Sequence, residues 1–184
     1  MEEIKILFFI LASFFGREDG RIAAEKTTVT INPEKKTIEI IQEDLFAVIQ
    51  SQEDSITVLR QWEELISYQE NTPKWSKELA TLPSKKFDLK SIKNEIQPHL
   101  ILNYSQEEDL RPLGIWYNKE KNQFTINNIL KDYIKTDDGK LEGNYWVFEG
   151  NRTFSFTIEP FLDTHSSYEN YKMPLKDIID DQGL

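Results

Sequence analysis

Alternation of apolar and polar residues marks the first predicted strands. Residues 27–42 place Val29 and Ile31 on one face and carry a turn signal in the middle, a pattern typical of a β-hairpin. The apolar run at 45–49 is too short for its period to classify, and we assign it to a strand. The chain is therefore predicted to begin its folded part with antiparallel β-structure.

The spacing of apolar residues changes to three and four positions between Ser51 and Tyr68. Apolar side chains at these steps, with polar residues opposite, predict one amphipathic helix. Ser51 and Asp54 approximate a capping box at its start, and Pro73 follows its end. Trp62 lies on the apolar stripe, so we interpret it as a core residue rather than a partner-binding anchor.

The second half of the chain is predicted to be mostly β-structure. Residues 99–104 form one strand, and residues 113–127 and 144–158 are each predicted to form a hairpin. Within 153–158, three apolar residues alternate strictly with Ser and Thr. That alternation is the pattern of an antiparallel strand with one buried face and one wet face.

Together these elements predict an α+β fold. We expect a twisted or curved antiparallel sheet, ordered as a meander, with one main amphipathic helix packed on it. Residues 25–162 are assigned to this single domain, residues 1–24 to a signal-like apolar segment and linker, and residues 163–184 to a polar tail. A chain of 184 residues buries roughly 70% of its surface on folding, enough for a core without disulfides or metals.

The apolar run at 6–15 supports two interpretations. Its length and position fit the central region of a secretory signal, and ten residues are too few to cross a bilayer as a helix. Glu2 and Glu3 weaken the expected positive flank, and Ile22-Ala23-Ala24 is the available small-residue cleavage site. We expect export to the periplasm or the extracellular space rather than a cytoplasmic location. Membrane contact is then expected only through an uncleaved N-terminal segment. The alternative is a buried strand or first helix at 4–15.

Leu11-Ala12-Ser13 resembles the start of a bacterial lipobox, and the Lys-, Glu-, Ile- and Asn-rich remainder is similar to small exported lipoproteins of AT-rich bacteria. That resemblance implies export and lipid attachment to a cysteine. Phe14 stands where the lipobox requires the cysteine, so this chain lacks the residue that would carry the lipid.

Composition and charge exclude several chemistries. The chain contains no cysteine, so thiolate nucleophiles, zinc–cysteine sites and iron–sulfur clusters cannot form. With 22 basic against 32 acidic residues, its net charge is −10, which argues against a nucleic-acid partner because such binding depends on Lys and Arg. No glycine-rich phosphate-binding motif occurs, and we predict no cofactor.

Candidate catalytic and metal-ligating residues are few. The two histidines, His99 and His165, lie 66 positions apart, and His99 is predicted to be a surface or edge residue. His165 lies beside Asp163 and Ser166, but we interpret that segment as part of the polar tail because catalytic triads are assembled from separate rigid elements. Acidic doublets recur along the chain and are interpreted as solvated loops. The sequence therefore predicts neither catalytic residues nor a metal site.

Aromatic density provides the main functional indication. Residues 113–161 contain ten aromatic side chains, and in 144–148 the apolar residues fall on both faces of the predicted strand. Such a strand is covered on both sides or presents one side to a ligand or partner. The residues predicted to bind are Trp116, Tyr117, Tyr145 and Trp146. The alternative is a large aromatic core packed by the helix.

These features favour a non-catalytic, exported binding or accessory protein over an enzyme. Its aromatic-rich sheet would hold a small apolar ligand or a protein partner. The first alternative is an acidic inhibitor or immunity-type protein that binds a basic protein, because complementary charge speeds and directs association. The second alternative is a hydrolase using carboxylates that the sequence does not identify.

Overall fold

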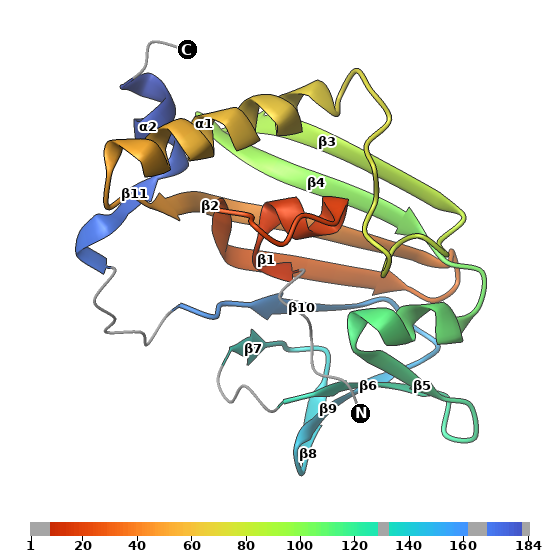
Figure 1. Ribbon diagram of the computed structural model, residues 1–184. Helices are drawn as coiled ribbons and strands as arrows, with labels where there is room; N and C mark the ends of the chain where they lie inside the picture. The colour runs from red at the N-terminus through yellow and green to blue at the C-terminus, as the bar shows by residue number, and fades with distance from the viewer. Residues whose placement is uncertain (1–7, 129–132, 162–168, 182–184) are drawn as a thin grey trace.

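The computed structural model describes residues 8–128, 133–161 and 169–181. It contains two antiparallel sheets, of seven and four strands, with one main helix and a short C-terminal helix (Figure 1). The α+β prediction with one main helix is confirmed, and the structure adds that the strands divide between two sheets. No helix in the described ranges is long and apolar enough to cross a membrane.

The larger sheet has the strand order β3-β4-β2-β1-β10-β7, and β11 pairs with the end of β2. The predicted hairpin at 27–42 is confirmed and is longer than expected, because β2 continues through the apolar run at 45–49 as far as Val48. The strands are β1 (Ala23–Asn32), β2 (Thr37–Val48), β3 (Ser84–Ile92), β4 (Glu95–Asn103), β7 (Ile134–Lys135), β10 (Phe154–Ile158) and β11 (Lys172–Pro174).

The smaller sheet has the order β5-β6-β9-β8, and its strands are β5 (Ile115–Asn118), β6 (Gln123–Asn127), β8 (Lys140–Glu142) and β9 (Tyr145–Glu149). The β5–β6 hairpin agrees with the prediction at 113–127. The predicted hairpin at 144–158 is wrong, because β9 pairs with β6 and β8 while β10 pairs with β1 and β7. The chain changes sheets there, so Phe148 and Phe154 meet face to face across the core instead of lying side by side in one sheet.

Helix α1 (Gln52–Ser67) begins with the predicted capping box. The Ser51 hydroxyl accepts a hydrogen bond from the Asp54 backbone N–H, and the Asp54 carboxylate accepts one from the Ser51 backbone N–H. Trp62 and Leu65 are buried, which confirms Trp62 as a core residue, whereas Ile56 and Ile66 at the two ends of the stripe are exposed. The other helical elements are η2 (Leu11–Phe15), η3 (Glu107–Leu113), η4 (Glu169–Tyr171) and α2 (Leu175–Asp180).

The described part of the apolar N-terminal run lies within the core. Phe8, Leu11 and Phe14 are completely buried, as the alternative of a buried element describes. Two strand side chains hold the segment in place, because the Phe8 carbonyl oxygen accepts hydrogen bonds from Thr27 Oγ1 at 2.6 Å and Gln42 Nε2 at 3.1 Å. In Figure 1, η2 and α1 cover the same face of the larger sheet.

Residues 169–181 differ from the loose polar tail expected beyond Pro160. They form η4, β11 and α2, and the side chains of Leu175 and Ile178 are buried against the core. A three-residue step between two apolar residues is enough to bury one side of a single helical turn. His165 and the rest of segment 162–168 lie outside the described residues.

His99 corrects a second expectation, that it lies at the surface or at a sheet edge. Its strand β4 is flanked by β2 and β3, which place Ile41 and Asp88 opposite it. Only 6% of His99 is exposed, and neither ring nitrogen has a hydrogen-bond partner among the described residues. The sequence reveals the alternation of β4 but not the strands on either side of it.

Candidate functional site

The two faces of the smaller sheet carry different parts of the predicted aromatic site. Strand register aligns Trp116, Thr125 and Val147 on one face. The adjacent positions on the other face include the fully buried Phe124, which packs against the core. Because neighbouring residues of a strand point to opposite faces, the four predicted site residues separate into two pairs.

Trp116 and Tyr145 share the face that points away from the core. This outward face borders a hollow of about 450 Å³. The Trp116 ring lies 5.3 Å from the Arg111 guanidinium, a cation–π contact, and its indole N–H has no hydrogen-bond partner in the described part of the chain. The hollow is lined by Trp116, Tyr117, Asn118, Lys121, Gln123, Thr125, Glu142, Tyr145 and Val147.

Tyr117 and Trp146 belong to the core-facing side of the same sheet. The Tyr117 ring lies 4.8 Å from that of Phe124, and its hydroxyl donates a hydrogen bond to Asn122 Oδ1 at 2.8 Å. The Trp146 indole N–H donates to Asn128 Oδ1 at 3.2 Å. Both side chains pack against the buried cluster, although Tyr117 also reaches the border of the hollow.

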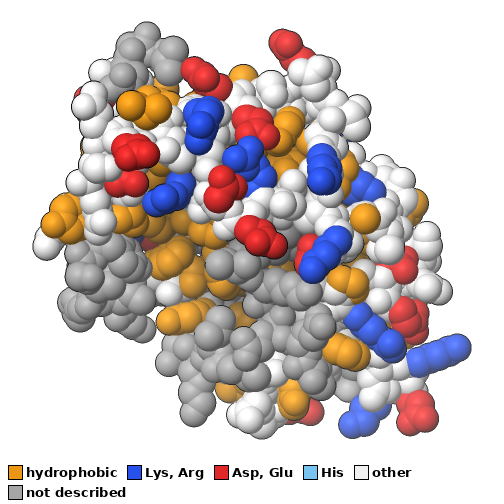
Figure 2. Space-filling model, viewed as in Figure 1, with side chains coloured by type: hydrophobic (Ala, Val, Ile, Leu, Met, Phe, Trp, Pro, Cys, Tyr) orange, Lys and Arg blue, Asp and Glu red, His pale blue; other side chains and the backbone are white. Residues whose placement is uncertain are grey.

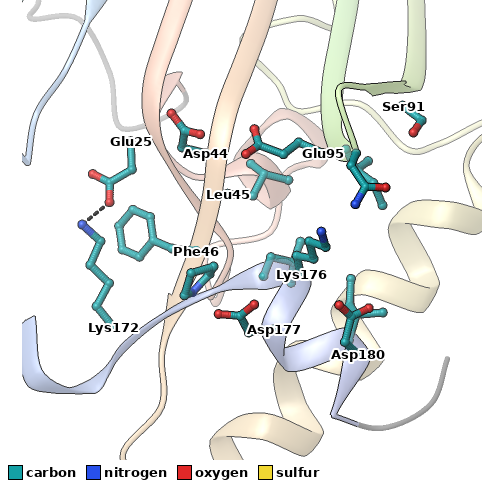
Figure 3. A pocket seen from close by; sticks show the side chains of 15 residues that line it. Glu25, Asp44, Leu45, Phe46, Ser91, Glu95, Lys172, Lys176, Asp177 and Asp180 are labelled. Atoms are coloured by element: carbon teal, nitrogen blue, oxygen red, sulfur yellow. Dashed lines mark ion pairs between the residues drawn. The ribbon is translucent and has the colours of Figure 1, made fainter.

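A larger cleft, of about 740 Å³, lies where β2, the β3–β4 turn and the C-terminal elements meet (Figure 3). Its floor contains Leu45 and Phe46, which are 7% and 4% exposed. The lining residues are Glu25, Asp44, Leu45, Phe46, Ser91, Asn94, Glu95, Ile96, Lys172, Pro174, Leu175, Lys176, Asp177, Ile179 and Asp180.

The border of this cleft is acidic. Five carboxylates and two lysines give the lining a net charge of −3. Lys172 forms an ion pair with Glu25, and its ammonium group also lies 4.6 Å from the centre of the Phe46 ring. The other four carboxylates form no ion pair within the described residues, and they come from β2, β4 and α2.

The wider surface shows no comparable segregation of charge on the side seen in Figure 2. Acidic and basic side chains are interspersed there over the strands and α1. Sequence reasoning missed the cleft because it interpreted the acidic doublets as separate solvated loops. Only the folded chain brings together carboxylates that are up to 155 positions apart, from Glu25 to Asp180.

Comparison with known proteins adds no functional assignment. No protein-family model, curated protein sequence or solved structure matches this chain. Within the described ranges, no group of three or more His, Asp and Glu side chains is close enough to hold a metal ion. The two candidate sites are therefore the outward face of the smaller sheet and the acidic cleft.

Proposed function

We propose that this protein is a binding protein that holds a small apolar ligand, or an apolar segment of a partner, on the outward face of the smaller sheet. The observation that carries the proposal is the placement of Trp116 and Tyr145, two half-buried aromatic residues that border a hollow of about 450 Å³ outside the core. A hollow of this size falls within the range of small-molecule sites.

The chemistry of the border supports a ligand with both apolar and polar parts. Trp116, Tyr145 and Val147 offer apolar surface. Amide, ammonium and carboxylate groups around them can donate and accept hydrogen bonds. These groups belong to Asn118, Gln123, Lys121 and Glu142. Aromatic side chains combine a large contact area with little loss of conformational freedom, which suits them to recognition.

A fluorescent apolar probe, 1-anilinonaphthalene-8-sulfonate, tests the proposal. We expect W116A and Y145A to raise the Kd of the folded protein for the probe by about tenfold, with a melting temperature changed by only a few degrees. The matched variants F124A and W146A alter the core side of the same sheet and should lower the melting temperature instead. Equal thermal losses in both pairs would assign the outward aromatics to stability rather than binding.

Binding to a basic protein partner is the second candidate function, and the net charge of −10 favours it. Complementary charge accelerates encounter and weakens with salt. A partner recovered at low ionic strength and released as salt rises would support this candidate. A partner retained at high salt would support the aromatic face.

Export is the location we propose, on the pattern of the apolar run at 6–15. The burial of Phe8, Leu11 and Phe14 argues against removal of this run as a signal, so the proposed export would have to leave the run within the fold. Mass spectrometry of the native protein distinguishes the cases. A mature chain that starts at Glu25 would indicate a cleaved signal, and a chain that retains Phe8 would indicate that the run stays part of the fold.

A further inference from the structure

We propose that the acidic cleft binds a small organic cation that carries two or more amino groups on an aliphatic chain. This site is separate from the outward face of the smaller sheet, and the inference does not depend on the function proposed for that face. The cleft has a volume of about 740 Å³, within the range of small-molecule sites.

The floor of the cleft accounts for the aliphatic part of the ligand. Leu45 and Phe46 are almost fully buried beneath the cavity, and the apolar surface open to a ligand comes from Ile96, which is 39% exposed, and from Pro174 and Ile179. A hydrocarbon chain on this floor would remove apolar surface from water. A small inorganic cation would gain nothing from such a floor.

The border determines the charge of the ligand. A net charge of −3 in a concave lining raises the local concentration of cations and repels anions. Lys172 shows how an ammonium group fits here, because it pairs with Glu25 and also lies over the Phe46 ring. The cleft therefore already accommodates one primary ammonium through an ion pair and a cation–π contact.

The positions of the remaining carboxylates favour an extended cation over a compact one. In Figure 3, Asp44 and Glu95 lie on one side of Lys176, and Asp177 and Asp180 lie on the other. These groups do not gather closely enough to hold a metal ion among the described residues. A flexible molecule with separated amino groups can reach both sides at once. Lys176 lies between them and competes for the same carboxylates.

Titration calorimetry with spermidine tests the inference on the full-length chain. We expect measurable binding that weakens as salt rises from about 0.02 to 0.2 M. The E95Q/D180N variant should raise the Kd about 2- to 30-fold, because each exposed charge contributes modestly. K176Q should lower the Kd about 2- to 5-fold by removing the competing ammonium group. All five residues substituted in these variants and in the control are exposed, and thermal denaturation verifies that each variant folds.

The matched control is E34Q/E120Q, which removes the same net charge at two exposed turn residues outside the cleft. Its Kd for spermidine should equal that of the unmodified chain. An equal loss in the control and in E95Q/D180N would overturn the proposal in favour of unspecific charge attraction. Absence of binding, or tighter cleft-dependent binding of a lysine-rich peptide than of spermidine, would also overturn the assignment to a small cation.

Discussion

Phe148 and Phe154 stack with their ring centroids 4.4 Å apart and their planes 19° apart, although each belongs to a different sheet. The five residues between them carry the chain from β9 in the smaller sheet to β10 in the larger one. Phe156 and Phe124 lie beside this pair at 5.9 Å from Phe148 and 5.4 Å from Phe154. The aromatic cluster therefore joins the two sheets into one core.

Loss of either ring should weaken both sheets. We expect F148A or F154A to reduce the free energy of unfolding by about 3–5 kcal/mol, because each removes a fully buried aromatic side chain. In urea denaturation, the double variant should show a coupling of about 0.5–1.5 kcal/mol between the two rings. T153A is the control, since Thr153 is exposed next to the same strand. Additive losses would mean that the stacked geometry contributes nothing beyond burial.

Deletion of residues 1–24 should abolish cooperative unfolding. It removes five large buried apolar side chains, each contributing about 1.5–3 kcal/mol by burial, and the total approaches or exceeds the stability of an ordinary domain. These residues are Phe8, Leu11, Phe14, Phe15 and Ile22. Circular dichroism during heating measures the effect, and E18A, at an exposed position, serves as the control. A deleted chain that melts like the full one would identify the segment as dispensable and strengthen the interpretation as a cleaved signal.

Gly150 should not tolerate even a methyl group. A Cβ atom built there would lie 2.3 Å from Asn122 Oδ1 and 2.8 Å from the Asn122 carbonyl oxygen. We expect G150A to cost about 1–3 kcal/mol, measured by thermal denaturation, because the β5–β6 turn would have to move. Gly143 provides the contrast: its φ is 62°, with open space around it, so G143N should cost less than about 1 kcal/mol. Equal costs would show that close approach at Gly150 is unimportant.

The ionised Asp54 carboxylate should stabilise the folded protein at neutral pH, and this contribution should be lost in acid. The backbone N–H groups of Gln50 and Ser51 and the Ser51 hydroxyl donate to its carboxylate, and these bonds hold the pKa of Asp54 below its usual value. A carboxylate with a lowered pKa in the folded state contributes stability above its unfolded pKa of about 3.9, and that contribution is lost as the pH falls through the folded pKa. Melting temperatures measured between about pH 7 and pH 2 should decline less steeply in D54N than in the unmodified chain. Parallel curves would contradict a role for this cap.

His99 should add a second acid-sensitive step at higher pH. Burial is the main cause that lowers the pKa of His99, and the Lys90 charge adds to it against the opposing carboxylates of Glu39, Asp88 and Glu43. The unfolded chain therefore takes up the proton on His99 more readily than the folded chain. Above about pH 6.5 this histidine does not reduce the free energy of unfolding, and below that pH the free energy of unfolding declines. H99Q should flatten the decline between about pH 7 and pH 5.5 in urea denaturation. An unchanged slope would assign the decline to other groups.

Local elements could be predicted from sequence because their signals are local. The alternation at 153–158 located β10, and Ser51 with Asp54 located the start of α1. The strand with which each strand pairs could not be predicted in the same way, since nothing in the sequence of β9 or β10 indicates that they belong to different sheets. Ala23 and Ala24 illustrate the limit: small residues that resemble a cleavage site also fit the buried beginning of β1.

The candidate sites show the same limit: the residue types could be predicted from the sequence, but their arrangement in space could not. Aromatic residues suitable for binding could be chosen from the sequence, but the choice between Trp116 and Tyr117 depends on which face each strand turns to the core. Strand register decides that, and register is set by pairing with distant residues. The acidic cleft was beyond prediction because residues from five strands and one helix surround it.

The pairing of Thr27 with Ile158 has a consequence for the order of events during synthesis. These partners are 131 positions apart, so β1 gains its second neighbour only after a ribosome has added 131 further residues. Until then β1 has one edge without a hydrogen-bonded strand. A growing chain with such an exposed edge is a natural client for chaperones that shield nascent polypeptides.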